Sequence, residues 1–259
     1  MTATKSLGQK PALFWAITEA GRAMTELGMS LPFRKFYSNT AGDGHPIVVL
    51  PGFMSSKRAT APLRNFLDQQ GYKTYDWGLG RNYGKLEYQD QLLVLVDKLY
   101  KEHGNRVSLI GWSLGGVFAR EIAKKRPNII RQVITLGSPF QAVVKKNNAT
   151  WLYTYASGGQ KVEDIDPALI AELPNPAPVP TTAIYSKEDG VVPWQYCMEK
   201  EETAIHQNIQ VRGSHLGLGV NPSVLHIIAD RLLYSSEDWQ HFKTGSVLED
   251  LFLYPPLSN

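Results

Sequence analysis

Apolar and polar positions follow two rhythms along the chain, and together they predict an α/β fold. Short apolar runs rich in β-branched residues are typical of strands buried on both faces of a sheet. Stretches with an apolar residue every three or four positions predict helices. The predicted strands are 47–50, 73–77, 107–110, 133–136, 182–185 and 209–211, and the predicted helices among them are 59–70, 86–103, 114–126 and 222–233. This alternation favours a mostly parallel sheet of about six strands with helices on both faces.

A further helix is predicted ahead of the first strand, over residues 11–28. Its apolar positions have helical spacing: Leu13, Ile17, Ala20, Met24 and Leu27. We expect these residues to pack the helix on the main body. The alternative is a surface helix that touches lipid, with Phe14 and Trp15 as anchors. Because its polar face carries acidic residues as well as Arg22, it is not distinctly basic, and packing is favoured.

One long segment, residues 140–180, interrupts the alternation. It contains an aromatic cluster at 151–155 and ends in a Pro-rich stretch, LPNPAPVP. An insertion of this length between strands is often a lid or a binding loop. We therefore expect a single domain over 1–259, with an N-terminal helical extension over 1–40 and a lid or cap at 140–180.

Composition and charge exclude some classes of function. The formal charge of +3 is slight and the basic residues are scattered, so nothing indicates nucleic-acid binding. The single cysteine, Cys197, excludes an internal disulfide and a cysteine-cluster metal site, and suits a reducing compartment. The N-terminus is a poor signal peptide, and no apolar run is long enough to span a bilayer. We expect a cytoplasmic protein with no integral membrane segment, and export by another route is the alternative.

The third predicted strand runs directly into Gly-Trp-Ser-Leu-Gly-Gly, and a predicted helix follows. Gly-x-Ser-x-Gly alone is a weak signal, but a strand before it and a helix after it are the context that a nucleophile requires. In such a turn the backbone is strained, and only small residues fit at Gly111 and Gly115. The turn would hold the Ser113 hydroxyl at the carboxyl edge of the sheet. The alternative is that Ser113 only caps the helix.

A serine nucleophile needs a base, and the base needs an orienting acid. In chain order, the acid and then the base should follow later strands. Asp189 follows the fifth predicted strand, and we prefer it to Glu188 because it adjoins the turn at Gly190. His215 lies in a Gly-rich loop after the sixth predicted strand, and none of the other five histidines has this place in the order.

The negative charge that develops on an attacked carbonyl needs backbone N–H donors, each contributing about 3 kcal/mol. One donor should be Leu114, the residue after the nucleophile. The other should lie in the loop after the first predicted strand, in VVLPGFMSS, where we expect Phe53, with Met54 as the alternative.

These stretches together, IVVLPGF, GWSLGG, TLGSP, YSKEDGVVPW and GSHLGLGVNP, resemble the α/β-hydrolase superfamily, particularly its small bacterial esterases and lipases. The resemblance covers about 47–233. It implies a Ser-His-Asp mechanism without a metal or organic cofactor. By this resemblance Ser113 is the nucleophile, Asp189 the acid and His215 the base.

The chain departs from the pattern of its relatives at three places. Pro51 stands where many relatives have histidine, but the oxyanion donors are backbone groups, so their function should survive. A helix and a connector replace the initial two-stranded hairpin, which leaves about six strands. Phe140 stands where related lipases often have histidine, so we expect a more apolar pocket mouth.

The leading hypothesis is hydrolysis of a carboxylic ester through an acyl-enzyme. Four large residues are candidates for an apolar substrate site, with the core as the alternative place for the second: Met54, Trp112, Phe140 and Trp151. The expected substrate is therefore a small-molecule or lipid-like ester. One alternative is an acyltransferase that uses the same acyl-enzyme. Another is a non-catalytic scaffold of this fold that binds a partner or lipid through 140–180 and the N-terminal helix.

Overall fold

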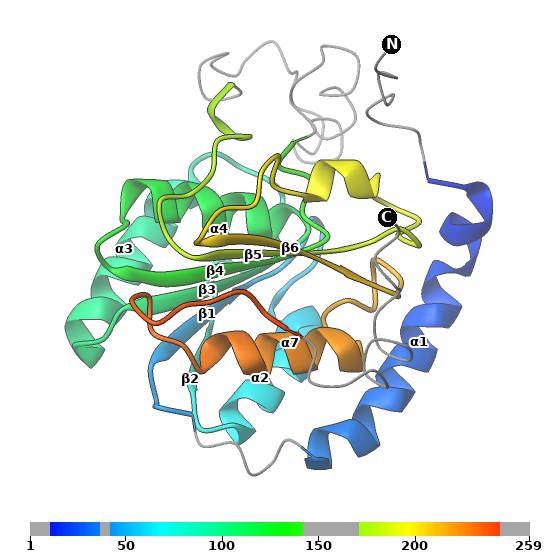
Figure 1. Cartoon of the computed structure of the whole chain (residues 1–259), viewed down its shortest axis with the longest axis horizontal. Coiled ribbons are helices and arrows are strands. Elements are labelled where there is room, and N and C mark those ends of the chain that lie inside the picture. Colours follow the sequence, from blue (N-terminus) through cyan, green and yellow to red (C-terminus); the bar gives the residue numbers. More distant parts are fainter. Residues whose placement is uncertain (1–10, 37–41, 142–170, 244–259) are drawn as a thin grey trace.

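The computed structural model describes residues 11–36, 42–141 and 171–243, and within them six strands form one sheet with helices on both faces (Figure 1). The strands are β1 (Pro46–Leu50), β2 (Lys73–Asp76), β3 (Val107–Trp112), β4 (Ile130–Leu136), β5 (Thr181–Ser186) and β6 (His206–Val211). The helices are α1 (Leu13–Phe36), α2 (Lys57–Gln69), α3 (Tyr88–His103), α4 (Leu114–Lys125), the short 3-10 helix η3 (Trp194–Cys197) and α7 (Pro222–Leu232). The predicted α/β class is confirmed, and each predicted strand and helix is present with shifts at its ends.

All neighbouring strands are parallel, in the order β2-β1-β3-β4-β5-β6. The chain moves outward in one direction from β1 to β2 and in the other from β3 to β6. The loops after β1 and β3 therefore lie beside each other where the order reverses. Ligands of open parallel sheets bind at such a point, outside the carboxyl ends of the strands. The expectation of about six strands is confirmed in the described part of the chain.

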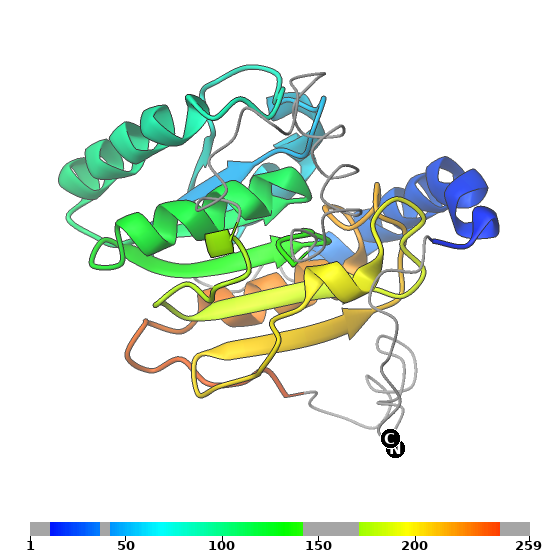
Figure 2. The ribbon, with the colours of Figure 1, turned by 90° about the horizontal axis from the view of Figure 1, so that it is seen from above.

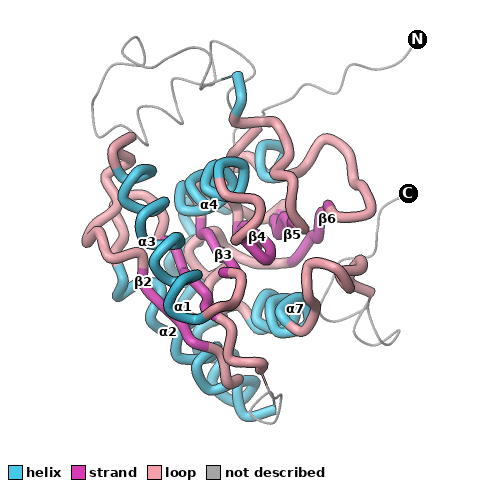
Figure 3. Tube along the Cα trace, turned by 90° about the vertical axis from the view of Figure 1, so that its left-hand side faces the viewer, coloured by secondary structure: helices cyan, strands magenta, loops and turns pink. Residues whose placement is uncertain are grey.

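Two apolar cores hold the layers together because neighbouring strand residues face opposite sides of the sheet. Leu109 packs in the core beneath α3 and α4, whereas the next residue, Ile110, packs in the core against α2 and α7. Figure 2 shows α3 and α4 across one face, and Figure 3 shows the strands between α4 and α7. Since strands of this kind are covered on both faces, they carry continuous apolar runs rather than alternating ones.

Helix α1 stands apart from these layers, at the carboxyl ends of the strands (Figures 1 and 2). Its outer side exposes large apolar residues at 41–76% of their surface: Leu13, Phe14, Ile17, Met24, Leu27, Met29 and Leu31. Its inner side instead buries Glu19 and Glu26. Helix α1 contacts the body as expected, but it does so through these carboxylates and not through the apolar residues whose spacing predicted the helix. Among the described residues, no helix is both long and apolar enough to cross a membrane.

The long segment after β4 is described only at its two ends, since 142–170 lie outside the described ranges. Gln141 donates from its backbone N–H to the Tyr196 carbonyl at 3.0 Å and from its side chain to the Pro174 carbonyl at 3.2 Å. Ala177 and Val179 are buried in the core beside α4. Both ends are thus anchored on the body, and the lid remains a prediction.

A buried ion pair fixes the exit of this segment. Arg120 of α4 is fully buried and pairs with Glu199, with its Nη2 3.2 Å from Glu199 Oε2. The same Nη2 donates to the Asn175 carbonyl at 2.9 Å. A buried charge is tolerated only when it is paired and hydrogen-bonded, and this one is both.

Candidate active site

The turn between β3 and α4 has the strained geometry expected of a nucleophile turn. Ser113 has φ 54° and ψ −122°, and it is one of two non-glycine residues with positive φ in the described ranges. Such a conformation costs on the order of 1–3 kcal/mol. A Cβ at Gly111 would lie 2.2 Å from Gly116 Cα, and one at Gly115 would lie 2.4 Å from the Leu50 carbonyl oxygen. The turn can therefore form only with glycine at both positions.

The Ser113 side chain has no structural task in the described part of the chain. The residue is 2% exposed, and its Oγ has no hydrogen-bond partner among the described groups. It makes no capping bond to α4, which disfavours the alternative of a simple helix cap. A buried hydroxyl without a partner is unfavourable, and such groups concentrate at functional sites. Its bond to a base often tightens only when substrate binds.

Asp189 and His215 form a buried pair beyond the carboxyl ends of the adjacent strands β5 and β6. Asp189 Oδ2 lies 2.6 Å from His215 Nδ1, and the two residues are 3% and 1% exposed. Asp189 Oδ1 accepts from the backbone N–H groups of Val191 and Val192 at 2.8 and 2.6 Å. One carboxylate oxygen therefore fixes the turn and the other faces His215. Because a carboxylate accepts, Nδ1 carries the proton and Nε2 remains available as a base.

The charge balance around His215 favours its protonated form. Burial alone would lower the pKa of His215, but the charge of Asp189, its hydrogen bond and the charge of Glu19 outweigh burial. The net effect raises the pKa of His215 above its ordinary value. This is the direction that helps an imidazole accept a proton during a reaction.

The rejected candidates for acid and base have other surroundings. The Glu188 carboxylate has no hydrogen bond or ion pair in the described structure, while its backbone carbonyl accepts from Arg22 at 2.9 Å. The other five histidines have partners elsewhere in the fold. His45 contacts Asp43 and Ser108, and His103 contacts Tyr75. His206 contacts Thr203 and Ala177, His226 contacts Phe242, and His241 contacts Thr203 and Trp239.

Two further residues contact the Asp189–His215 pair or its loop, and the sequence analysis missed both roles. Trp112 Nε1 donates to the His215 carbonyl at 3.0 Å. Its indole therefore holds the loop after β6 that carries His215, called the base loop from here on, beside the Ser113 turn. Gly137, after β4, has φ 56°, and a Cβ there would lie 3.1 Å from His215 Nδ1 and 3.2 Å from Asp189 Oδ2. The Leu-Gly-Ser-Pro stretch at the end of β4 is the sequence signal that could have indicated Gly137.

The two expected oxyanion donors lie on loops that approach each other. Leu114 is the first residue of α4, so its N–H has no acceptor within the helix. The loop after β1 passes close to Ser113, since a Cβ at Gly52 would lie 3.2 Å from Ser113 Cβ. The N–H of Met54 donates to the Asn82 carbonyl at 2.7 Å, so Met54 is engaged elsewhere, and Phe53 stays the predicted second donor.

Asn82 holds this loop in place, a role that the sequence analysis did not anticipate. It is fully buried, and its Nδ2 donates to the Pro51 carbonyl at 2.8 Å. Its backbone N–H donates to the Ser55 carbonyl at 2.8 Å. Together with the bond from Met54, these contacts bracket Phe53 on both sides.

The four predicted substrate-binding residues are placed differently from one another. Phe140 is fully buried in the core, and the Arg120 guanidinium lies 3.8 Å from its ring centroid, so it lies in the core rather than at a pocket mouth. Met54 is 49% exposed, Trp112 contacts the base loop, and Trp151 lies outside the described residues.

Among the described residues, no three His, Cys, Asp or Glu side chains lie close enough together to bind a metal ion.

Comparisons with known proteins agree with this architecture. Residues 80–166 match the family described as the PGAP1-like alpha/beta domain. The mouse (Mus musculus) serine hydrolase BPHL is 28% identical over 129 residues, a match that covers 46% of this chain and 44% of the mouse protein. The chain thus spans less than half the length of this curated relative.

Solved structures show the same fold at low sequence identity. The crystal structure of Aspergillus fumigatus lipase B superposes with a TM-score of 0.61 and 15% identity, over 85% of this chain and 59% of the lipase. Bacillus licheniformis lipase BlEst2 superposes with a TM-score of 0.52 and 16% identity, over 75% of this chain and 94% of the lipase. The chain therefore has the fold of α/β hydrolases, and the solved structures that share this fold include lipases and esterases.

Proposed function

We propose that this chain hydrolyses carboxylic esters with an apolar acyl part, through an acyl-enzyme on Ser113. The observation that carries the proposal is the buried Asp189–His215 pair beside a strained turn, where the Ser113 hydroxyl has no partner among the described groups. The likeness to serine hydrolases, lipases and esterases supports the same chemistry.

In the acylation step, Ser113 Oγ attacks the acyl carbon while His215 Nε2 takes the hydroxyl proton. Asp189 keeps the proton on Nδ1 and stabilises the imidazolium that forms. The N–H groups of Leu114 and Phe53 donate to the oxyanion. His215 then protonates the leaving alcohol, and the C–O bond of the ester breaks.

In the deacylation step, His215 Nε2 removes a proton from water, and the hydroxide attacks the acyl-enzyme. The second tetrahedral intermediate collapses as His215 returns that proton to Ser113 Oγ. The carboxylic acid leaves, and the starting protonation state is restored. No atom beyond the ester and one water is consumed.

Exposed apolar side chains support the choice of an apolar acyl part. Leu216, directly after His215, is 46% exposed, and Met54, directly after Phe53, is 49% exposed. Tyr83, next to Asn82, is 44% exposed. All three adjoin residues of the proposed machinery, so they are suited to contact an acyl chain that reaches the reacting carbon.

The test is turnover of p-nitrophenyl esters of increasing chain length by the wild type and Ser113→Ala, with product analysis in the presence of a competing alcohol. We expect free acid as the main product and no turnover by the variant. Because the pKa of His215 is raised above its ordinary value of 6.5, kcat/KM should rise with pH through a pKa above that value. Transfer to the alcohol in preference to water would indicate an acyltransferase. Wild type that cleaves no ester would favour a non-catalytic scaffold.

A further inference from the structure

Helix α1 turns its charged side toward the proposed active site. Glu19 is 4% exposed and Glu26 is 9% exposed, whereas apolar residues of the same helix, such as Ile17 and Met24, are 73% and 76% exposed. This is the reverse of an ordinary surface helix, whose apolar side faces the core. The buried carboxylates of Glu19 and Glu26 therefore need hydrogen-bond donors or positive charges from the rest of the fold.

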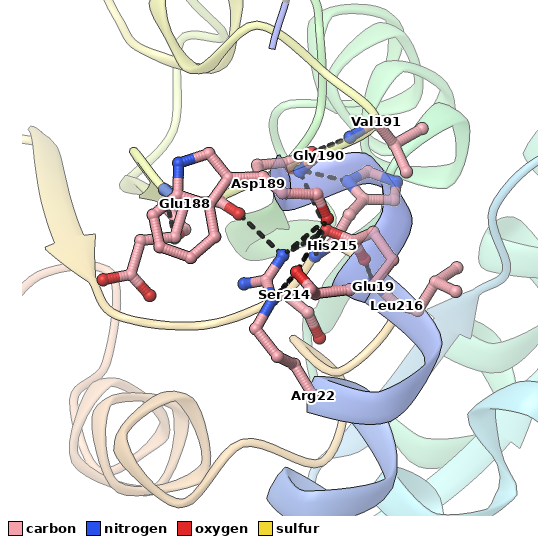
Figure 4. Close-up of polar contacts among 12 residues, drawn as sticks. Glu19, Arg22, Glu188, Asp189, Gly190, Val191, Ser214, His215 and Leu216 are labelled. Carbon is pink, nitrogen blue, oxygen red and sulfur yellow. Dashed lines mark hydrogen bonds and ion pairs between the residues drawn. The ribbon is translucent and has the colours of Figure 1, made fainter. Parts of the chain in front are cut away.

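The Glu19 carboxylate accepts backbone hydrogen bonds from both loops that carry the Asp–His pair (Figure 4). Its Oε1 accepts from the N–H of Gly190 at 2.8 Å and from the N–H of His215 at 3.0 Å. Its Oε2 accepts from the N–H of Leu216 at 3.0 Å. One side chain thus connects the turn after Asp189 with the loop that bears His215.

Two further residues of α1 extend this contact. Glu26 Oε1 accepts from the N–H of Ser214 at 2.7 Å, so carboxylates of α1 bind three consecutive N–H groups of the base loop. Arg22 pairs with Glu19 at 3.0 Å and donates to the Glu188 carbonyl at 2.9 Å. Backbone groups that would otherwise be buried without partners are satisfied by the helix.

Both loops leave room for α1 only because they contain glycine. A Cβ at Gly190 would lie 2.4 Å from the Trp15 carbonyl carbon, and a Cβ at Gly217 would lie 2.0 Å from Glu26 Oε2. The first of these contacts is with backbone, which cannot move aside as a side chain can. The close approach of α1 is therefore built into the sequences of the acid turn and the base loop.

We propose that Glu19 is a positioning residue for the ester hydrolysis proposed above: it fixes Asp189 and His215 relative to each other and stabilises the imidazolium of His215. The inference rests on that proposed function. It assigns the N-terminal helix to the catalytic machinery and not only to the outer surface of the fold.

Among the residues that the structure describes, the charged groups around His215 come from two elements. Asp189 belongs to the turn after β5, and Glu19, Arg22 and Glu26 belong to α1. The groups that approach from β3 and β4, Trp112 and Gly137, are uncharged. Burial lowers the pKa of His215, whereas Asp189 and then Glu19 raise it, so removal of the Glu19 charge should lower it.

The experiment compares Glu19→Gln, Glu19→Ala and Glu188→Gln in the full chain. Glu19→Gln keeps an oxygen at the site but removes the charge. We expect the NMR titration of His215 and the acidic limb of kcat/KM to move down by about 0.5 pH unit, with the plateau rate within about threefold. Glu19→Ala should lower kcat by about 10- to 100-fold with little change in KM, since the two loops lose their common acceptor.

Glu188→Gln is the matched control, because it removes a neighbouring carboxylate that has no side-chain contact in the described structure. It should leave the His215 titration and kcat unchanged. A purely structural role would lower the melting temperature of both Glu19 variants while the His215 titration and kcat of the folded protein stay at wild-type values, and that result would overturn the inference. If the wild type cleaves no ester, the proposed function fails, but the NMR titration still tests the coupling of Glu19 to His215.

Discussion

Removal of the Asn82 side chain should damage catalysis more than it damages stability. Asn82 Nδ2 donates to the buried Pro51 carbonyl at 2.8 Å, at the start of the loop that carries Phe53. In Asn82→Ala this carbonyl loses its donor, which should cost about 1–3 kcal/mol of unfolding free energy. For a chain of this length, each kcal/mol lowers the melting temperature by about 2–4 °C.

The effect on rate follows from the position of the loop. A single oxyanion donor contributes about 10²- to 10³-fold to kcat when it is fully in place. The variant retains the Phe53 N–H but loosens its support, so we expect kcat to fall by about 10- to 100-fold. KM should change by less than about threefold, because the oxyanion forms only after binding.

Gln132→Ala is a matched control for this prediction. Gln132 is 1% exposed, and its Nε2 donates to the Arg231 carbonyl at 3.0 Å. It pairs with Ser108 at the start of β3, at the opposite end of the sheet from Ser113. The control should lose similar stability and keep its kcat. Equal kcat for Asn82→Ala and the control, measured on folded protein, would refute the reasoning.

Two further predictions concern the stability of the fold. Glu199→Ala should destabilise the protein by about 3–5 kcal/mol in denaturant unfolding, because the fully buried Arg120 would lose its counter-charge; a loss below about 1 kcal/mol would contradict this. Burial and the charge of Arg131 hold the pKa of His45 at about 4, below its ordinary 6.5. Between these two pH values the unfolded chain binds a proton that the folded chain does not, so acidification from 6.5 to 4 should remove about 3 kcal/mol. The unfolding free energy of His45→Gln should depend less steeply on pH over this range than that of the wild type. An equal dependence would show that another group is responsible.

The strand and helix pattern could be read from the sequence because local periodicity and turn residues decide it. The apolar run before Pro51 and the Gly104 stop after α3 both specify structure within a few residues. The order of the serine, acid and histidine loops also follows from local patterns. The structure adds the contact between Asp189 and His215, while their chemical roles remain proposals.

The orientation of α1 could not be read in this way. Periodicity identified its apolar stripe correctly, but the stripe faces outward because Glu19 binds N–H groups almost 200 residues later in the chain. A carboxylate that will accept from a distant loop has no local signature. Phe140 illustrates the same limit, since the core residues and the Arg120 guanidinium that contact it come from other elements of the fold.

The most direct measurement of the central claim is the site of reaction with a fluorophosphonate. The wild type, Ser113→Ala and Asp189→Asn would be labelled, digested and mapped by mass spectrometry. The account predicts one adduct on the peptide that contains Ser113, no adduct in Ser113→Ala, and slow labelling of Asp189→Asn because His215 loses its orienting partner. Labelling of Ser113→Ala at the wild-type rate, or an adduct at another residue, would show that Ser113 is not the nucleophile.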